Sequence, residues 1–204
     1  MKYLVIGGTG RTGRRAVDLL RHLGHEVLVG TRRPREEQSV AVDLANPLDP
    51  LLPAGIDGII VSVEPPVDDA AADAVMSTGI GRLAELAAAE KIPVVLISQI
   101  YITRAAEHPD MAGIIRARGA GEQALRNSGA PYVIVRPSWL TDASPTGAHL
   151  EQGDRGDGRV SRDTVAQAAV AALLHPESHG KTFELYDGPN PVDWPSAFTA
   201  LTAD

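Results

Sequence analysis

The stretch that decides the fold begins at residue 2, where Lys2-Tyr3-Leu4-Val5-Ile6 runs directly into Gly7-Gly8-Thr9-Gly10-Arg11-Thr12-Gly13. The short apolar run predicts a buried strand, and the glycine-rich segment opens a predicted helix. Glycines at 7, 10 and 13 let the backbone turn sharply, bring main-chain amides close to a pyrophosphate, and allow tight packing of helix on strand. This position favours a dinucleotide-binding turn, against the alternative of a glycine-rich turn that binds nothing.

The rest of the chain continues the same alternation of strand and helix. Runs rich in Val, Ile and Leu predict strands at residues 2–6, 26–30, 39–42, 58–63, 93–98, 132–136 and 182–186. Alanine-rich segments between them predict helices at residues 12–23, 73–89, 111–128, 162–174 and 194–201. We therefore predict an α/β fold, a doubly wound parallel sheet in one domain over residues 1–204. The segment 141–158 is expected to be a long substrate loop beyond the sixth strand.

Composition limits the classes of partner. The 204 residues suit a single domain, and 26 acidic against 19 basic residues give a net charge of −7, which disfavours nucleic acid and anionic lipid. The absence of cysteine excludes disulfides, thiolate catalysis and iron–sulfur clusters. We find neither a signal-peptide core nor the roughly 20 apolar residues of a membrane span. We expect a cytoplasmic monomer or homodimer whose main partner is a small molecule.

The end of the second predicted strand indicates which dinucleotide is bound. An NAD site usually has Asp or Glu there for the ribose 2′-hydroxyl, but this chain has Thr31-Arg32-Arg33. The guanidinium of Arg32 would pair well with the 2′-phosphate of NADP, and Arg11 could add a second positive group. The alternative is that Arg32 and Arg33 are solvated loop residues. We predict NADP in preference to NAD.

Several ordered motifs give the chain a resemblance to a known group over nearly its whole length. They are Gly7-Gly8-Thr9-Gly10-Arg11-Thr12-Gly13, Arg32, Asp43-Leu44, Glu122, Arg136-Pro137-Ser138-Trp139-Leu140, Thr146-Gly147-Ala148 and Val160-Ser161-Arg162-Asp163-Thr164-Val165-Ala166. With these motifs the chain resembles the atypical short-chain dehydrogenase/reductase proteins of the biliverdin reductase B (flavin reductase) and NmrA type. The resemblance implies that Asp43 and Leu44 border the adenine, that Ser62 and Val63 line the ribose and pyrophosphate groove, and that Ser98 lies near the nicotinamide. It also implies that residues 137–140 run past the nicotinamide.

The chain departs from this family's pattern at the catalytic acid. Many short-chain dehydrogenases use a Tyr-x-x-x-Lys pair to donate a proton as the hydride arrives. Counting back from Glu122, the lysine position is Arg118 and the tyrosine position is Ile114. Neither side chain can relay a proton, although Arg118 could bind the nicotinamide ribose or simply pair with Glu122. The usual alcohol dehydrogenase mechanism is therefore not expected.

Other candidate groups follow the fifth and sixth predicted strands. Tyr101 could replace the missing acid or only pack, and the loop histidines His108 and His149 could exchange a proton or be merely solvated. Trp139 and Met111 would form an apolar wall suited to an aromatic substrate, or belong to the core. No histidine pair has metal-ligand spacing, and no serine lies in a G-x-S-x-G motif. We expect no metal site and no hydrolase.

Two sets of residues are therefore predicted to form the site. The candidates for catalysis are Ser98, Tyr101, Arg118 and His149. The candidates for binding NADP are Gly7, Thr9, Gly10, Arg11, Thr12, Gly13, Arg32, Asp43, Leu44, Ser62, Val63, Ser98, Arg118, Pro137, Trp139 and Leu140. The leading hypothesis is an NADP-dependent oxidoreductase that transfers hydride to a flavin-like or quinone-like acceptor. The alternatives are an NADP(H)-sensing regulatory protein and a non-redox cyclase or isomerase on the same scaffold.

Overall fold

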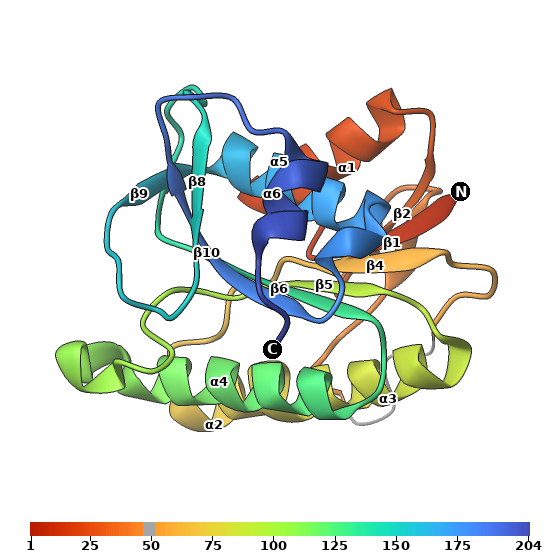
Figure 1. Ribbon diagram of the computed structural model, residues 1–204. Helices are drawn as coiled ribbons and strands as arrows, with labels where there is room; N and C mark the ends of the chain where they lie inside the picture. The colour runs from red at the N-terminus through yellow and green to blue at the C-terminus, as the bar shows by residue number, and fades with distance from the viewer. Residues whose placement is uncertain (47–51) are drawn as a thin grey trace.

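The computed structural model describes residues 1–46 and 52–204, which form an α/β sandwich around one large sheet (Figure 1). The strands are β1 (Lys2–Ile6), β2 (Glu26–Thr31), β3 (Ser39–Ala41), β4 (Gly58–Val61), β5 (Val94–Ile97), β6 (Tyr132–Pro137), β7 (Trp139–Thr141), β8 (Ala148–Glu151), β9 (Arg159–Ser161) and β10 (Lys181–Asp187). The helices are α1 (Arg11–His22), α2 (Asp69–Asp73), α3 (Ile80–Glu90), α4 (Ala112–Asn127), α5 (Arg162–Leu174) and α6 (Trp194–Ala200). Over the described residues, no helix has the length and apolar character needed to cross a membrane.

The strand order of the large sheet is β3-β2-β1-β4-β5-β6-β10-β8. Each neighbouring pair runs parallel, except that β8 pairs antiparallel with β10. The chain adds strands outward from β1 in one direction and then returns to add β4 on its other side. The predicted doubly wound parallel sheet is confirmed, and the reversal between β1 and β4 opens a crevice at the carboxyl ends of these strands.

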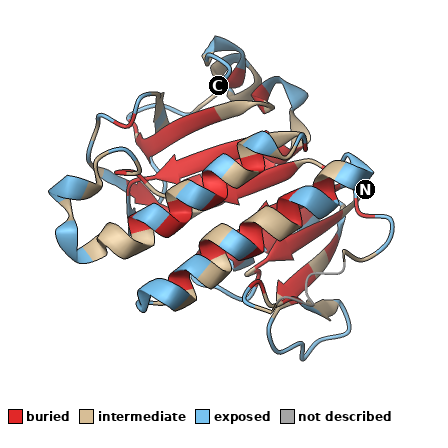
Figure 2. Cartoon of the chain, turned by 90° about the horizontal axis from the view of Figure 1, so that it is seen from below, coloured by how far each residue is buried: buried red, intermediate tan, exposed pale blue. Residues whose placement is uncertain are grey.

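Two hydrophobic cores lie on opposite faces of the sheet because successive strand residues point to opposite faces. Val5 of β1 belongs to the core under α1 and α5, whereas its neighbour Leu4 belongs to the core under α3 and α4. Figure 1 shows α1, α5 and α6 on one side of the sheet and α2, α3 and α4 on the other. In Figure 2 the buried residues of the long helices face the sheet and their exposed residues face outward.

The helix expected at residues 73–89 begins earlier and is interrupted. It starts with α2, where the Asp68 side chain accepts a hydrogen bond from the Ala71 amide at 2.9 Å, and passes through a π-helical segment, Ala74–Gly79, into α3. A Cβ on Gly121 of α4 would lie 1.9 Å from the Met76 carbonyl oxygen in this segment. The widened turn and the glycine together let α4 pack closely, a tertiary effect that propensity does not predict.

The segment expected to be one loop at residues 141–158 contains a strand. β8 joins the edge of the sheet, where Leu150 pairs with Leu185 of β10. At the two ends of this segment, β7 and β9 form a separate two-stranded parallel sheet. The expected long loop therefore contains the strand β8, because a four-residue strand among glycines and polar residues is formed by pairing with a distant partner.

Candidate functional site

The turn after β1 is shaped by glycines that have no room for a side chain. Gly7 has a φ of +81°, and a Cβ there would lie 2.1 Å from the Ser62 carbonyl oxygen; a Cβ on Gly13 would lie 2.3 Å from the Gly7 carbonyl oxygen. α1 begins at Arg11 after Gly10, which supplies no side-chain cap. The first amides of α1 therefore have no helical carbonyl partner and can bind an anion in the crevice.

A cavity of about 590 Å³ opens at this turn. Its walls come from the glycine turn, the ends of β4, β5 and β6, the strand β7, the first half of α4 and the start of α5. The lining residues are Gly10, Arg11, Thr12, Ser62, Val63, Glu64, Ile97, Ser98, Gln99, Ile100, Tyr101, Met111, Arg118, Pro137, Ser138, Trp139, Leu140 and Arg162. The volume suits a drug-sized ligand or part of a dinucleotide.

Most of the predicted site residues meet in this cavity. Those that line it are Gly10, Arg11, Thr12, Ser62, Val63, Ser98, Tyr101, Arg118, Pro137, Trp139 and Leu140. Gly7 and Gly13 pack behind the turn. Thr9 lies exposed in the turn outside the cavity lining, and so does Arg32 after β2, whose side chain has no ion-pair partner within the described ranges. Asp43 accepts a hydrogen bond from the Ala45 amide at 3.1 Å, and Leu44 is buried in the core.

His149 is not brought to the cavity. It lies exposed on β8, with its ring centroid 6.2 Å from that of Tyr186. Pairing of β8 with β10 carries it to the far edge of the sheet, whereas a loop would have left it free to approach the site. Conversely, Arg162 was quoted in a family motif but not predicted as a site residue, because it follows the three-residue strand β9, which has no periodic signal.

Two buried polar groups in the cavity lack protein partners. The Ser98 hydroxyl and the Nε of Arg118 are buried without a hydrogen bond to any described residue. Among the described residues, the Arg118 side chain donates only to the Ile97 carbonyl, at 3.3 Å, and it lies 4.0 Å from the carboxylate of the exposed Glu64. Burial lowers the pKa of Arg118, with Glu64 and Glu122 opposing this. Such groups are costly unless a ligand satisfies them.

Of the two alternatives for Arg118, pairing with Glu122 is not found in the described structure, because Glu122 has other partners. The Glu122 carboxylate is completely buried and accepts hydrogen bonds from Arg136, at 2.6 Å, and from Arg126, at 3.1 Å. Arg136 also donates to Glu184 at 3.0 Å. Glu122 is therefore neutralised by other arginines, which leaves the donors of Arg118 available to the cavity.

Aromatic side chains form the opposite wall. The indole Nε1 of Trp139 donates to the Tyr101 hydroxyl at 3.1 Å, and the His108 ring centroid lies 4.0 Å from that of Tyr101. Met111 completes the wall, and Trp139 remains 47% exposed. The expected apolar wall is therefore present, and an exposed tryptophan of this kind offers a stacking surface for a planar ligand.

Ion pairs link the segments that form the rim of the cavity. Asp142, just after β7, forms ion pairs with Arg11 of the glycine turn, with Arg162 at 3.2 Å and with Arg15 at 3.4 Å. Arg15 also pairs with Asp163 at 3.0 Å. In the described part of the chain, no group of three or more His, Cys, Asp or Glu residues could hold a metal ion.

Comparison with known proteins agrees with this geometry. Residues 7–176 match the NAD(P)H-binding family, and the chain belongs to it. It is 24% identical to the uncharacterized sugar epimerase YhfK of Bacillus subtilis, over 94% of this chain and 97% of that protein. It is 29% identical to the (4-alkanoyl-5-oxo-2,5-dihydrofuran-3-yl)methyl phosphate reductase of Streptomyces griseus, over 97% of this chain and 69% of that protein.

Solved structures share the fold. A candidate NAD-dependent epimerase/dehydratase from Bacillus halodurans superposes with a TM-score of 0.84 and 21% identity, over 98% of this chain and all of that one. A candidate NADH-flavin reductase from Streptococcus pneumoniae superposes with a TM-score of 0.75 and 18% identity, over 92% of this chain and all of that one. Epimerase-like and reductase-like proteins are thus both built on this scaffold, so the fold alone does not identify the reaction.

Proposed function

We propose that this protein is an NADPH-dependent reductase that transfers a hydride to a conjugated or aromatic small-molecule acceptor. The observation that carries the proposal is one cavity that combines unpaired buried donors at Ser98 and Arg118 with an aromatic wall at Tyr101 and Trp139. When bound, the nicotinamide would supply the hydride. The rest of the chemistry depends on what these side chains do.

The binding roles follow from the donors available. The open amides at the start of α1 would bind the pyrophosphate, where helix geometry favours an anion. Arg118 and Ser98 would hydrogen-bond the nicotinamide ribose, which satisfies their unpaired atoms. Residues 137–140 would lie along the nicotinamide. Arg32 would bind the 2′-phosphate, since a guanidinium suits a phosphate and no described carboxylate pairs with it.

The lack of a Tyr/Lys proton donor supports a conjugated or aromatic acceptor. Position 114 is isoleucine, partly buried against the core, and position 118 is a permanently charged arginine, so the Tyr/Lys proton donor is absent. An acceptor such as a flavin or quinone stabilises its own reduced anion and needs less protonation by the protein. The name of the Streptomyces griseus reductase, which is 29% identical to this chain, is consistent with this class of reaction.

Stopped-flow oxidation of NADPH with a panel of flavins and quinones tests the proposal. We expect turnover with at least one planar acceptor, and a lower rate when Trp139 is replaced with alanine. Trp194→Ala, in α6 outside the cavity lining, is the control and should leave the rate nearly unchanged. Tight binding of NADPH without turnover of any acceptor would refute a reductase and favour an NADP(H) sensor.

A further inference from the structure

Tyr101 occupies an unusual backbone conformation in the wall of the cavity. Its φ is +71°, in the left-handed region that large L-residues rarely adopt. The side chain is nevertheless buried, with only 4% exposed, and it lines the cavity. A strained residue of this kind persists only when its surroundings hold it in place, and such residues cluster at functional sites.

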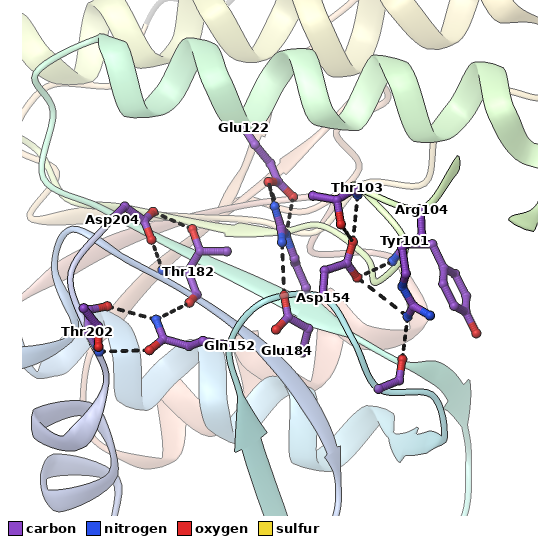
Figure 3. A network of polar contacts seen from close by, with 12 residues as sticks. Tyr101, Thr103, Arg104, Glu122, Gln152, Asp154, Thr182, Glu184, Thr202 and Asp204 are labelled. Carbon is purple, nitrogen blue, oxygen red and sulfur yellow. Dashed lines mark hydrogen bonds and ion pairs between the residues drawn. The ribbon is translucent and has the colours of Figure 1, made fainter. Parts of the chain in front are cut away.

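Asp154 supplies that restraint from a loop 53 residues away (Figure 3). One carboxylate oxygen accepts a hydrogen bond from the Tyr101 amide at 2.7 Å. The other accepts from the Thr103 amide at 2.7 Å and from the Thr103 hydroxyl at 2.9 Å. The Asp154 side chain is completely buried, so the carboxylate that accepts these charge-assisted bonds is removed from water.

Arg104 closes the same arrangement from the other side. Its guanidinium donates to the Gly156 carbonyl at 2.6 Å and lies 4.0 Å from the Asp154 carboxylate. It also lies 4.7 Å from the centre of the Tyr101 ring, within the range of a cation–π contact. The loop around Asp154 and the segment after β5 are thereby joined into one unit.

The Tyr101 hydroxyl is placed to interact with a ligand. It accepts the Trp139 hydrogen bond and lies beside the exposed carboxylate of Asp157. Burial raises the pKa of Tyr101, and Asp157 raises it further, so the phenol keeps its proton at neutral pH. A carbonyl oxygen or ring nitrogen of an acceptor could replace the Asp157 carboxylate as the partner of that proton.

We propose that Asp154 is a positioning residue that holds Tyr101 in its left-handed conformation, so that the Tyr101 hydroxyl donates a hydrogen bond to the acceptor. The contact with the acceptor rests on the proposed function. The restraint of Tyr101 by Asp154 does not, and it can be measured without turnover.

Fluorescence of Trp139 measures the restraint directly. In a Trp194→Phe background, Trp139 is the remaining tryptophan of the chain. Asp154→Asn replaces one acceptor oxygen with an amide that cannot accept from the backbone. We expect the Trp139 emission to shift to longer wavelength and acrylamide quenching to increase, because Tyr101 no longer holds the indole. Asp110→Asn removes a charge from the same region at an exposed position and should change neither.

Kinetics then separate positioning from general stability. We expect Tyr101→Phe to lower kcat by about two- to tenfold and to leave the Kd of NADPH nearly unchanged. Asp154→Asn should lower kcat at least as much, and Tyr101→Phe should have no further effect in the Asp154→Asn background. Additive effects, or unchanged kcat in Tyr101→Phe, would overturn the proposed contact.

The fluorescence measurement tests the restraint of Tyr101 by Asp154 independently of the kinetic results. A folded Asp154→Asn variant with unchanged Trp139 emission would overturn it. If Asp154→Asn does not fold, Thr103→Val serves instead, because it removes only the Thr103 hydroxyl from Asp154. We expect it to shift the Trp139 emission in the same direction by a smaller amount. An unchanged emission spectrum in this variant would also overturn the restraint. A chain that reduces no acceptor refutes the proposed function and leaves the emission test intact.

Discussion

Replacing Arg118 with methionine should weaken NADPH binding without destabilising the protein alone. Arg118 is buried with 6% exposed, has one long hydrogen bond to the Ile97 carbonyl and is 4.0 Å from an exposed carboxylate. Exchanging a poorly paired buried charge for an apolar side chain of similar length is neutral or stabilising, by about 1–4 kcal/mol in favourable cases. A lost charge-assisted hydrogen bond to the ribose costs about 1.5–3 kcal/mol, or roughly a 10- to 150-fold increase in Kd.

Calorimetric titration with NADPH and chemical unfolding of the free protein measure the two effects separately. Arg116→Met is the matched control, because Arg116 lies on the same helix with its side chain 65% exposed and pairs with Asp69 at the surface. It should change neither quantity appreciably. If Arg118→Met instead lowers the free energy of unfolding by more than about 3 kcal/mol and leaves NADPH binding intact, Arg118 is a structural residue and the reasoning fails.

Three further substitutions test the binding of the dinucleotide and the stability of the fold. Arg32→Ala should weaken NADPH by roughly ten- to a hundredfold and leave NADH nearly unchanged, as measured by titration of both dinucleotides. Gly13→Ala places a Cβ 2.3 Å from the Gly7 carbonyl oxygen, so it should destabilise the fold by about 1–3 kcal/mol in urea unfolding and weaken both dinucleotides. Asp204→Asn should cost about 1–3 kcal/mol at pH 7, because the Asp204 carboxylate accepts from the Thr182 hydroxyl at 2.6 Å. Burial raises the pKa of Asp204, but its hydrogen bonds outweigh this and hold the pKa below its usual value of 3.8. The contribution should be complete above that value and disappear as the pH falls through the lowered pKa, as unfolding at a series of pH values would show.

Each of these expectations has a contrary outcome. Equal weakening of NADPH and NADH, or none, would make Arg32 a solvated loop residue. Gly81→Ala is the control for Gly13, because its Cβ would meet Ala124 at an ordinary 3.6 Å, and a similar loss of stability in both variants would contradict the steric argument. A cost of Asp204→Asn that is the same at pH 2 and pH 7 would show that its charge has no part in stability.

Local sequence patterns were sufficient to predict the strands of the large sheet and the glycine turn of the site. Buried parallel strands are continuous apolar runs, so β1, β2, β4, β5, β6 and β10 could be located from composition and spacing. The glycine turn could be located because a strand followed by close-packed glycines needs no distant partner to form. The resemblance to short-chain dehydrogenases, counted back from Glu122, placed Ile114 and Arg118 at the positions of the family's tyrosine and lysine.

The other features of the fold and the site depend on contacts between residues far apart in the sequence, which local patterns do not predict. β8 forms because β10 offers it a free sheet edge, and this pairing removes His149 from the cavity. Arg162 reaches the rim because β9 pairs with β7, and Tyr101 is held by a carboxylate 53 residues away.

The sequence by itself determined the α/β class and the position of the dinucleotide turn, because each depends on neighbours within a few residues or one helical turn. Only the tertiary structure decided that the Nε of Arg118 is buried without a hydrogen bond while Arg136 neutralises Glu122, and that Asp154 binds the Tyr101 backbone amide. Burial and long-range hydrogen bonding set the energies of these polar groups, and neither is defined until the whole sheet has assembled.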